Sequence, residues 1–193
     1  MPRPSADDVG SRSRILEAAL VLMSEHGAAG TSMRMLAGEC GLNVATLYHY
    51  FPSKADLLRA VLAERGYLDR LASENPPAEV RRSGPPAARL TRLVRWIWWA
   101  GQQEEAVWRL LVGESLRGDA TARAEALALV DGLDVGIAGW LEEVVPELAD
   151  RSQVVARLVR ALLFSLIVEH LALGPDDDRA KARIADLVGA VLP

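Results

Sequence analysis

Cysteine is almost missing from this sequence, and its scarcity excludes two classes of small fold. The single residue, Cys40, has no partner for an internal disulfide, and no cluster of cysteine and histidine has the spacing of metal ligands. We therefore expect no metal site and no bound cofactor. One unpaired thiol is also typical of a protein from a reducing compartment.

Long apolar runs are missing too. The longest, residues 161–168, is too short to cross a bilayer, and the chain does not open with a charged segment followed by an apolar one. We expect a cytoplasmic protein with no membrane partner. Nucleophile-elbow, phosphate-loop and metalloenzyme motifs are also missing, so the sequence predicts no catalytic residue and no enzyme.

The sequence has no excess of positive charge. Its net charge is −4, and residues 1–60 contain as many acidic as basic side chains. The bulk charge therefore gives no support for nucleic-acid binding. Any such function must depend on where a few cations and hydroxyl groups are placed.

A helical pattern is present along most of the chain. Half of the 193 residues are apolar, which is enough for a sizeable core, and they recur at three- and four-residue steps. The pattern predicts an all-α fold of about nine helices, after a flexible arm over residues 1–10. Beyond two pairs of prolines, the expected helices lie near residues 87–101, 103–116, 119–144, 151–173 and 177–191.

The first 74 residues predict a compact set of short helices. The second, third and fourth each begin after a serine, threonine or asparagine that can cap them, and the first ends at Gly27, where a left-handed conformation is accessible. Two short helices separated by a glycine turn and braced by longer ones form a helix-turn-helix unit. The expected helices cover residues 11–26, 33–40, 44–50 and 54 onward, with N-caps from Thr31 or Ser32, from Asn43, and from Ser53 paired with Asp56 in a capping box. We assign the helix-turn-helix domain to residues 11–52, a connecting helix to 53–74 and a helical domain to 75–193.

Residues 43–54, NVATLYHYFPSK, carry side chains suited to reading DNA. Three short ones stand in the first turn of the third helix, where they would allow close approach to base edges and thymine methyl groups, while Leu47 and Phe51 would anchor that helix. Arg34 is the natural reader of guanine. The predicted base contacts come from Arg34, Val44, Ala45 and Thr46, and the predicted phosphate contacts from Thr31, Ser32, Tyr48, Tyr50 and Lys54. For either tyrosine alone, ordinary amphipathic packing is the simpler account.

Residues 31–58, TSMRMLAGECGLNVATLYHYFPSKADLL, resemble the N-terminal domain of the TetR (tetracycline repressor) family of bacterial transcriptional regulators. The stretch T-L-Y-x-Y-F-P-S-K is highly specific, whereas beyond residue 60 only the general plan of an all-α ligand-binding and dimerisation domain is similar. The resemblance implies a repressor that binds a palindromic operator as a homodimer and is released by a small-molecule effector. It implies the same DNA contacts, with His49 at a variable position that faces phosphate or solvent. Val44 departs from the family, where this position is often polar or basic, so direct base readout is expected to be sparse.

The tryptophans suggest an effector pocket. Four of the five lie within residues 96–108, and three indoles on one turn cannot all face a core. Either they fill bulky core and groove positions, or some line a pocket for a flat, apolar or cationic ligand. The predicted ligand-binding residues are Trp96, Trp99, Gln103, Trp108 and Phe164.

The helix expected near residues 151–173 is apolar over most of its circumference, so it must be covered on two sides. Either it is the central helix of a monomer, or its small residues admit a second copy in a two-fold dimer, as the family plan also implies. The predicted interface residues are Ala161, Ser165, Val168, Ala172, Leu187 and Val191. His170 on this helix is better explained as a satisfied core residue than as a catalytic one.

Two other functions remain open from the sequence. One is a helical ligand-binding protein or enzyme whose N-terminal unit only packs against the rest. The other is a similar regulator without a small-molecule ligand, which responds to a partner protein.

Overall fold

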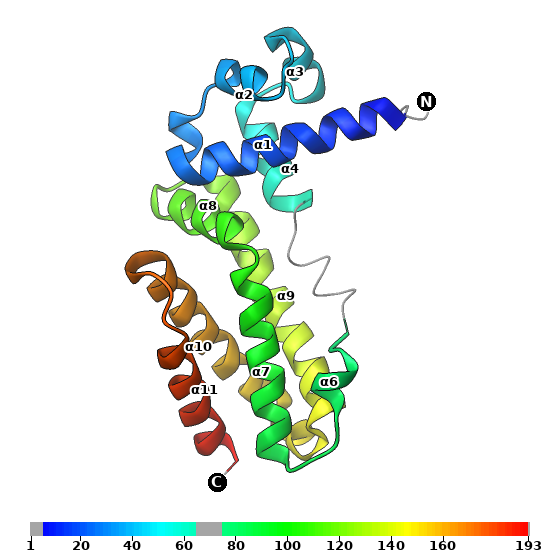
Figure 1. The fold of residues 1–193 in the computed structure, drawn as a ribbon, viewed down its shortest axis with the longest axis vertical. Coiled ribbons are helices and arrows are strands. Elements are labelled where there is room, and N and C mark those ends of the chain that lie inside the picture. Colours follow the sequence, from blue (N-terminus) through cyan, green and yellow to red (C-terminus); the bar gives the residue numbers. More distant parts are fainter. Residues whose placement is uncertain (1–5, 65–74, 193) are drawn as a thin grey trace. The chain divides into compact units, whose positions relative to one another are not determined.

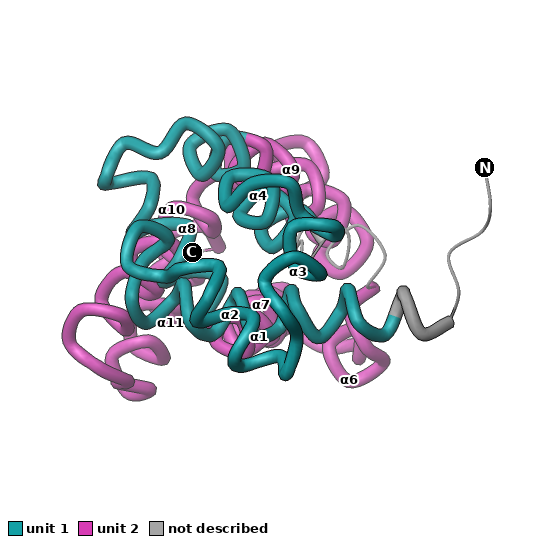
Figure 2. The backbone as a smooth tube through the Cα atoms, turned by 90° about the horizontal axis from the view of Figure 1, so that it is seen from above, with its two compact units in different colours: residues 1–66, 106–127 teal, residues 67–105, 128–193 magenta. Residues whose placement is uncertain are grey.

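The computed structural model describes residues 6–64 and 75–192, and every regular element in these residues is a helix (Figure 1). Ten α-helices and one 3-10 helix are found there, against the expected total of about nine. The all-α prediction is confirmed. The helices form two compact units, residues 1–66 with 106–127 and residues 67–105 with 128–193 (Figure 2).

Unit 1 contains the four N-terminal helices. They are α1 (Ala6–Gly30), α2 (Met33–Glu39), α3 (Val44–Tyr50) and α4 (Lys54–Glu64), joined by α8 (Glu105–Leu116) from residue 106 onward and by the first residues of α9 (Ala120–Val144). Helix α1 packs against α4 and α2, and α2 packs against α3. Ile15, Met23, Leu36, Leu47 and Leu57 are fully buried in this unit. The predicted helix-turn-helix arrangement is therefore present.

The first helix differs from the prediction at both ends. It begins at Ala6 rather than at residue 11, because residues 6–10 contain no proline and each added residue extends the hydrogen-bond ladder of a long helix; residues 1–5 lie outside the described part. At Gly27 the backbone breaks, with φ 73° and ψ 160°. The positive φ was expected, but this ψ is extended, a combination open almost only to glycine. A single further turn then runs to Gly30.

Unit 2 holds the remaining helices, and its boundaries follow the apolar periodicity. The elements are α6 (Ala78–Arg81), α7 (Pro86–Gln102), the later part of α9, the 3-10 helix η1 (Pro146–Arg151), α10 (Ser152–Leu173) and α11 (Asp177–Val191). Helix α7 packs against α6, α10 and α11. The five predicted helices beyond residue 86 agree with these bounds to within two residues, whereas α6 and η1 were not predicted. The predicted connecting helix is described only to Glu64.

None of the helices within residues 6–64 and 75–192 combines the length and hydropathy that a bilayer span requires.

Candidate nucleic-acid interface

Helix α3 is held at its first residue and along one face. The Asn43 side-chain oxygen accepts a hydrogen bond from the backbone N–H of Thr46 at 2.7 Å and one from its hydroxyl at 3.0 Å. Leu47 and Phe51 are buried, as predicted, and the Arg12 guanidinium lies 5.1 Å from the centre of the Phe51 ring. This cap and this anchor fix the direction of a helix of only seven residues.

The opposite face of α3 is open. Ala45 and His49 are exposed, and 47% of Tyr48 is accessible, while Val44, Thr46 and Tyr50 are half-buried. The rings of His49 and Tyr50 meet edge to face at 5.8 Å. The short side chains of the first turn and the Tyr48 hydroxyl are thus free to approach another molecule, which is what the predicted DNA contacts require.

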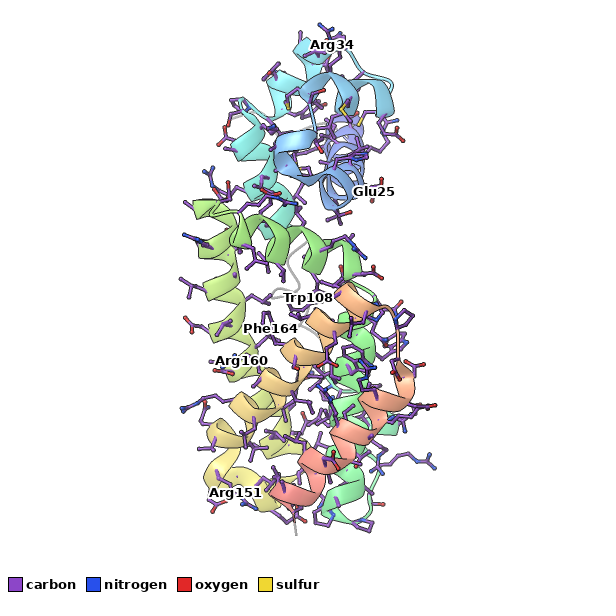
Figure 3. The ribbon with its side chains drawn as sticks, turned by 90° about the vertical axis from the view of Figure 1, so that its left-hand side faces the viewer. Glu25, Arg34, Trp108, Arg151, Arg160 and Phe164 are labelled. Carbon is purple, nitrogen blue, oxygen red and sulfur yellow. The ribbon has the colours of Figure 1, made fainter. Side chains whose placement is uncertain are left out.

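Helix α2 presents Arg34 on the outer surface of unit 1 (Figure 3). Its N-cap is Ser32, whose hydroxyl oxygen accepts from the backbone N–H of Met35 at 3.1 Å. The sequence left Thr31 and Ser32 as alternatives for this cap. The structure selects Ser32, which stays exposed beside the helix start.

The predicted phosphate contact of Thr31 is wrong. This residue is fully buried, and its hydroxyl lies 3.1 Å from the carbonyl of Leu22 and 2.9 Å from that of Gly27. The side chain bridges the break in α1 to the last full turn before it. The residue type alone does not reveal that the Thr31 hydroxyl points into the protein.

Lys54 at the start of α4 has a local role that the sequence did not reveal. Its ammonium donates to the carbonyls of Ala29 at 3.3 Å and Thr31 at 3.2 Å. An ammonium group has three N–H donors, so one remains for a phosphate oxygen. The predicted phosphate contact stays a prediction.

The predicted capping box at the start of α4 is confirmed. The Ser53 hydroxyl accepts from the backbone N–H of Asp56 at 3.1 Å and donates to its carboxylate at 2.7 Å. Together with Arg59, which donates at 2.9 Å, this hydroxyl holds the pKa of Asp56 below its ordinary value. Elsewhere in unit 1, burial raises the pKa of the Cys40 thiol, which favours its protonated form.

Comparisons with known proteins agree with this geometry. Residues 15–61 match the family described as "Bacterial regulatory proteins, tetR family". The chain is 34% identical over 116 residues to the HTH-type transcriptional repressor KstR of Rhodococcus jostii, covering 59% of this chain and 51% of that protein. It is also 39% identical over 54 residues to the regulator UidR of Escherichia coli, 28% of each chain. The N-terminal part of this chain is therefore related to TetR-family regulators.

The matched segment covers about half the length of KstR and 28% of UidR. The rest of the chain is therefore compared with solved structures. Salmonella enterica GusR superposes with a TM-score of 0.69, at 18% identity and with 95% of this chain and 96% of GusR covered. A putative TetR-family regulator from Mesorhizobium loti gives a TM-score of 0.72 with the same identity and coverage. Both show that this chain shares their fold along nearly its whole length.

The five residues predicted to bind an effector have different surroundings. Trp96 packs edge to face on Trp140 at 5.1 Å, and Trp108 is buried in unit 1, on α8. Trp99 is 58% exposed and Phe164 49%, while the Gln103 amide donates weakly to the carbonyl of Trp99. As expected, the indoles of α7 do not all face the core, but which of these five residues contact a ligand stays a prediction.

A polar contact lies beside the tryptophans, and only one of its two residues, His170, was singled out from the sequence. The His170 Nε2 atom lies 3.3 Å from the carboxylate of Glu105, and its ring meets buried Trp98 edge to face at 6.2 Å. His170 is half-buried, and its Nδ1 atom is buried without a hydrogen-bond partner among the described residues, so the prediction of a satisfied core residue holds only for Nε2. Glu105 stands 65 positions away, so no local pattern linked the two.

A cleft of about 460 Å³ lies in unit 1, on a surface that the sequence did not single out. It is bounded by α1 and α8, and its lining includes Glu25 (Figure 3), Gly27, Arg109, Gly113 and Arg117. No group of three or more metal-ligating side chains is gathered anywhere in the described residues.

The predicted dimer residues of α10 and α11 divide into two sets. Ala161, Val168 and Ala172 are exposed, and Ser165 and Leu187 are half-buried. Val191 is wrong as an interface residue, because it continues the buried stripe of α11 into the core of unit 2. The other five remain predictions.

We predict that Asn43→Ala lowers the free energy of unfolding by about 1 kcal/mol, because two N-terminal hydrogen bonds of α3 are lost. Urea unfolding followed by circular dichroism measures the change. Asn43→Ser is the matched control, since serine also caps helices well, and it should stay within about 0.5 kcal/mol of wild type. Equal loss in both variants would mean that the cap does not stabilise α3.

Proposed function

We propose that this chain is a transcriptional repressor that binds a palindromic DNA operator as a homodimer and releases it when a small apolar or aromatic effector binds. The observation that supports this most directly is α3, a capped and anchored helix whose opposite face carries exposed Ala45 and Tyr48. A rigid helix with short side chains in its first turn fits the major groove. KstR carries the word repressor in its name, which favours repression here.

The dimer is supported by the outer face of α10. Four large apolar side chains on it are between 38% and 56% exposed in the single chain, namely Val154, Leu158, Phe164 and Val168. Together with exposed Ala161 and Ala172 they lie on one face of the helix, which also carries exposed Arg157, while the other side of the helix is in the core. A second copy related by a two-fold axis would cover this face and present two α3 helices to one palindrome, about 34 Å apart.

The effector is proposed to bind unit 2 near Trp99. An indole that is 58% exposed on a helix with three tryptophans offers a flat apolar surface, and an indole face also attracts a cation. Simultaneous fit of two DNA-reading units makes affinity sensitive to their spacing. A shift of a few ångströms on effector binding therefore suffices to release the operator.

The DNA-binding proposal predicts that selection from random DNA with the wild-type chain enriches a palindrome whose affinity falls as salt rises. Arg34→Ala should weaken binding to that fragment about tenfold or more, and Tyr48→Phe about threefold, by loss of a base and a phosphate contact. Arg95→Ala on α7 removes an equal charge from an exposed position of the other unit, away from the proposed dimer face, and should leave affinity unchanged. Electrophoretic mobility shifts measure all three, and the absence of any enriched sequence would contradict the proposal.

The dimer proposal predicts that Val168→Asp produces a monomer in sedimentation velocity, because a buried carboxylate would face its own copy across the two-fold axis. DNA affinity should fall in parallel, since a monomer has one reading helix. Gln153→Asp, an exposed polar position at the start of the same helix, should remain dimeric. A wild-type monomer, or a dimeric Val168→Asp, would refute this interface.

The effector proposal predicts that some members of a panel of uncharged and cationic polycyclic aromatics change the tryptophan fluorescence of the wild-type chain. The same compounds should weaken operator binding about tenfold. Trp99→Ala should abolish both effects and preserve DNA binding in the absence of compound. If DNA binds but no compound changes either signal, a regulator without a small-molecule ligand is the better description.

A further inference from the structure

The segment from residue 27 to residue 31 turns the chain from α1 into α2, and we call it the α1–α2 corner. Three side chains from different parts of unit 1 hold its backbone. Thr31 donates to the Gly27 carbonyl, Lys54 of α4 donates to the carbonyls of Ala29 and Thr31, and the N–H of Ala28 donates to the Glu114 carboxylate of α8 at 3.0 Å. The corner is therefore fixed by side chains rather than by apolar packing alone.

Glu114 is the most unusual of these groups. It is 5% exposed, and among the described residues it is the one charged side chain that is buried. A buried carboxylate destabilises a protein unless it is paired and hydrogen-bonded. Here it accepts from Ala28 and from Arg117, whose guanidinium lies 2.7 Å away.

Two glycines leave room for this ion pair. A Cβ atom at Gly27 would lie 3.2 Å from a Glu114 carboxylate oxygen and 3.4 Å from the Arg117 guanidinium carbon, and one at Gly113 would lie 3.2 Å from an Arg117 nitrogen. Gly27 also has the positive φ that only glycine adopts readily. The break in α1 is thus shaped around Glu114 and Arg117, and Arg117 also lines the cleft.

The corner leads directly into the DNA-reading helices. Its last residue precedes Ser32, the N-cap of α2, and Arg34 follows two positions later. Helix α2 packs on α3, so the direction in which the corner leaves α1 sets the positions of both helices. The sequence assigned α8 to the regulatory domain, yet residues 106–127 belong to the same compact unit as the reading helices.

We infer that Glu114 is a positioning residue for DNA binding, which acts through the Ala28 amide to hold the α1–α2 corner and does not contact DNA itself. This inference rests on the proposed DNA-binding function. It makes α8 a structural part of the DNA-reading unit. A loss of the carboxylate would loosen α2 and α3 while leaving their DNA contacts chemically intact.

The test compares Glu114→Ala with Glu114→Gln in the full chain, at a temperature where circular dichroism shows both fully folded. Glutamine keeps an oxygen for the Ala28 N–H, and alanine does not. We expect Glu114→Ala to weaken binding to the selected fragment about tenfold, and Glu114→Gln to stay within about threefold of wild type. The slope of log affinity against log salt should equal that of wild type in both, because Glu114 neutralises no phosphate.

Two further variants and one readout without DNA complete the design. Arg117→Ala should weaken binding about threefold, since that guanidinium is 59% exposed and its ion pair is partly screened, and it replaces Glu114→Ala if the latter does not fold. Glu125→Ala on α9, in the same unit, should bind like wild type. Amide hydrogen exchange at Ala28 should accelerate about tenfold in Glu114→Ala and remain near wild type in Glu114→Gln.

The outcomes separate the two proposals. If wild type selects no DNA, the proposed function fails, and the exchange rate at Ala28 alone decides whether Glu114 holds the corner. If folded Glu114→Ala binds DNA as tightly as wild type, or if glutamine does not restore binding, Glu114 is not a positioning residue.

Discussion

The structure of unit 1 depends on the anchoring of a helix that is too short to persist alone. Helices below about 12 to 15 residues are marginal in water, and α3 has seven. Its order therefore comes from the Asn43 cap and from burial of Leu47 and Phe51, which use one end and one face. The side chains of α3 proposed to meet DNA lie on the part of the helix that these interactions leave open, so the same interactions make α3 rigid and keep that part accessible.

Hydrogen-bonding side chains fix the position of the backbone more narrowly than apolar packing alone does. Apolar contacts are not directional, and a helix resting on a smooth core can shift along it at little cost. The α1–α2 corner adds directional hydrogen bonds that involve Thr31, Lys54 and Glu114. Each of these bonds forms only when the backbone of the corner is in one position. Burying a carboxylate there would be unfavourable without its partners, so the arrangement favours specificity of position over stability.

The sequence predicted local features well and the direction of individual side chains poorly. Apolar periodicity and caps gave helix bounds to within two residues beyond residue 86, and the Ser53 capping box was confirmed, because these features depend on neighbours in the chain. Thr31 and Val191 were misassigned because residue type does not say which way a side chain points. The contact between Glu114 and Ala28 spans 86 positions, but one signal was available: Glu114 follows Val107 and Leu111 on the buried stripe of α8, where a charge needs a partner.

The proposed dimer also follows from the chemistry of α3. Val44 and Ala45 cannot donate or accept hydrogen bonds through their side chains, so one α3 would make few directional contacts with bases. A single reading helix of this kind would bind weakly and discriminate mainly through Arg34, thymine methyl groups and DNA shape. Linking two such helices converts the second binding event into an intramolecular one, which multiplies both affinity and selectivity. In the proposed dimer, control would lie in the spacing of the two helices, so that an effector need only alter the distance between them. The apolar side chains of α10 would then be as necessary for operator recognition as the side chains that touch the bases.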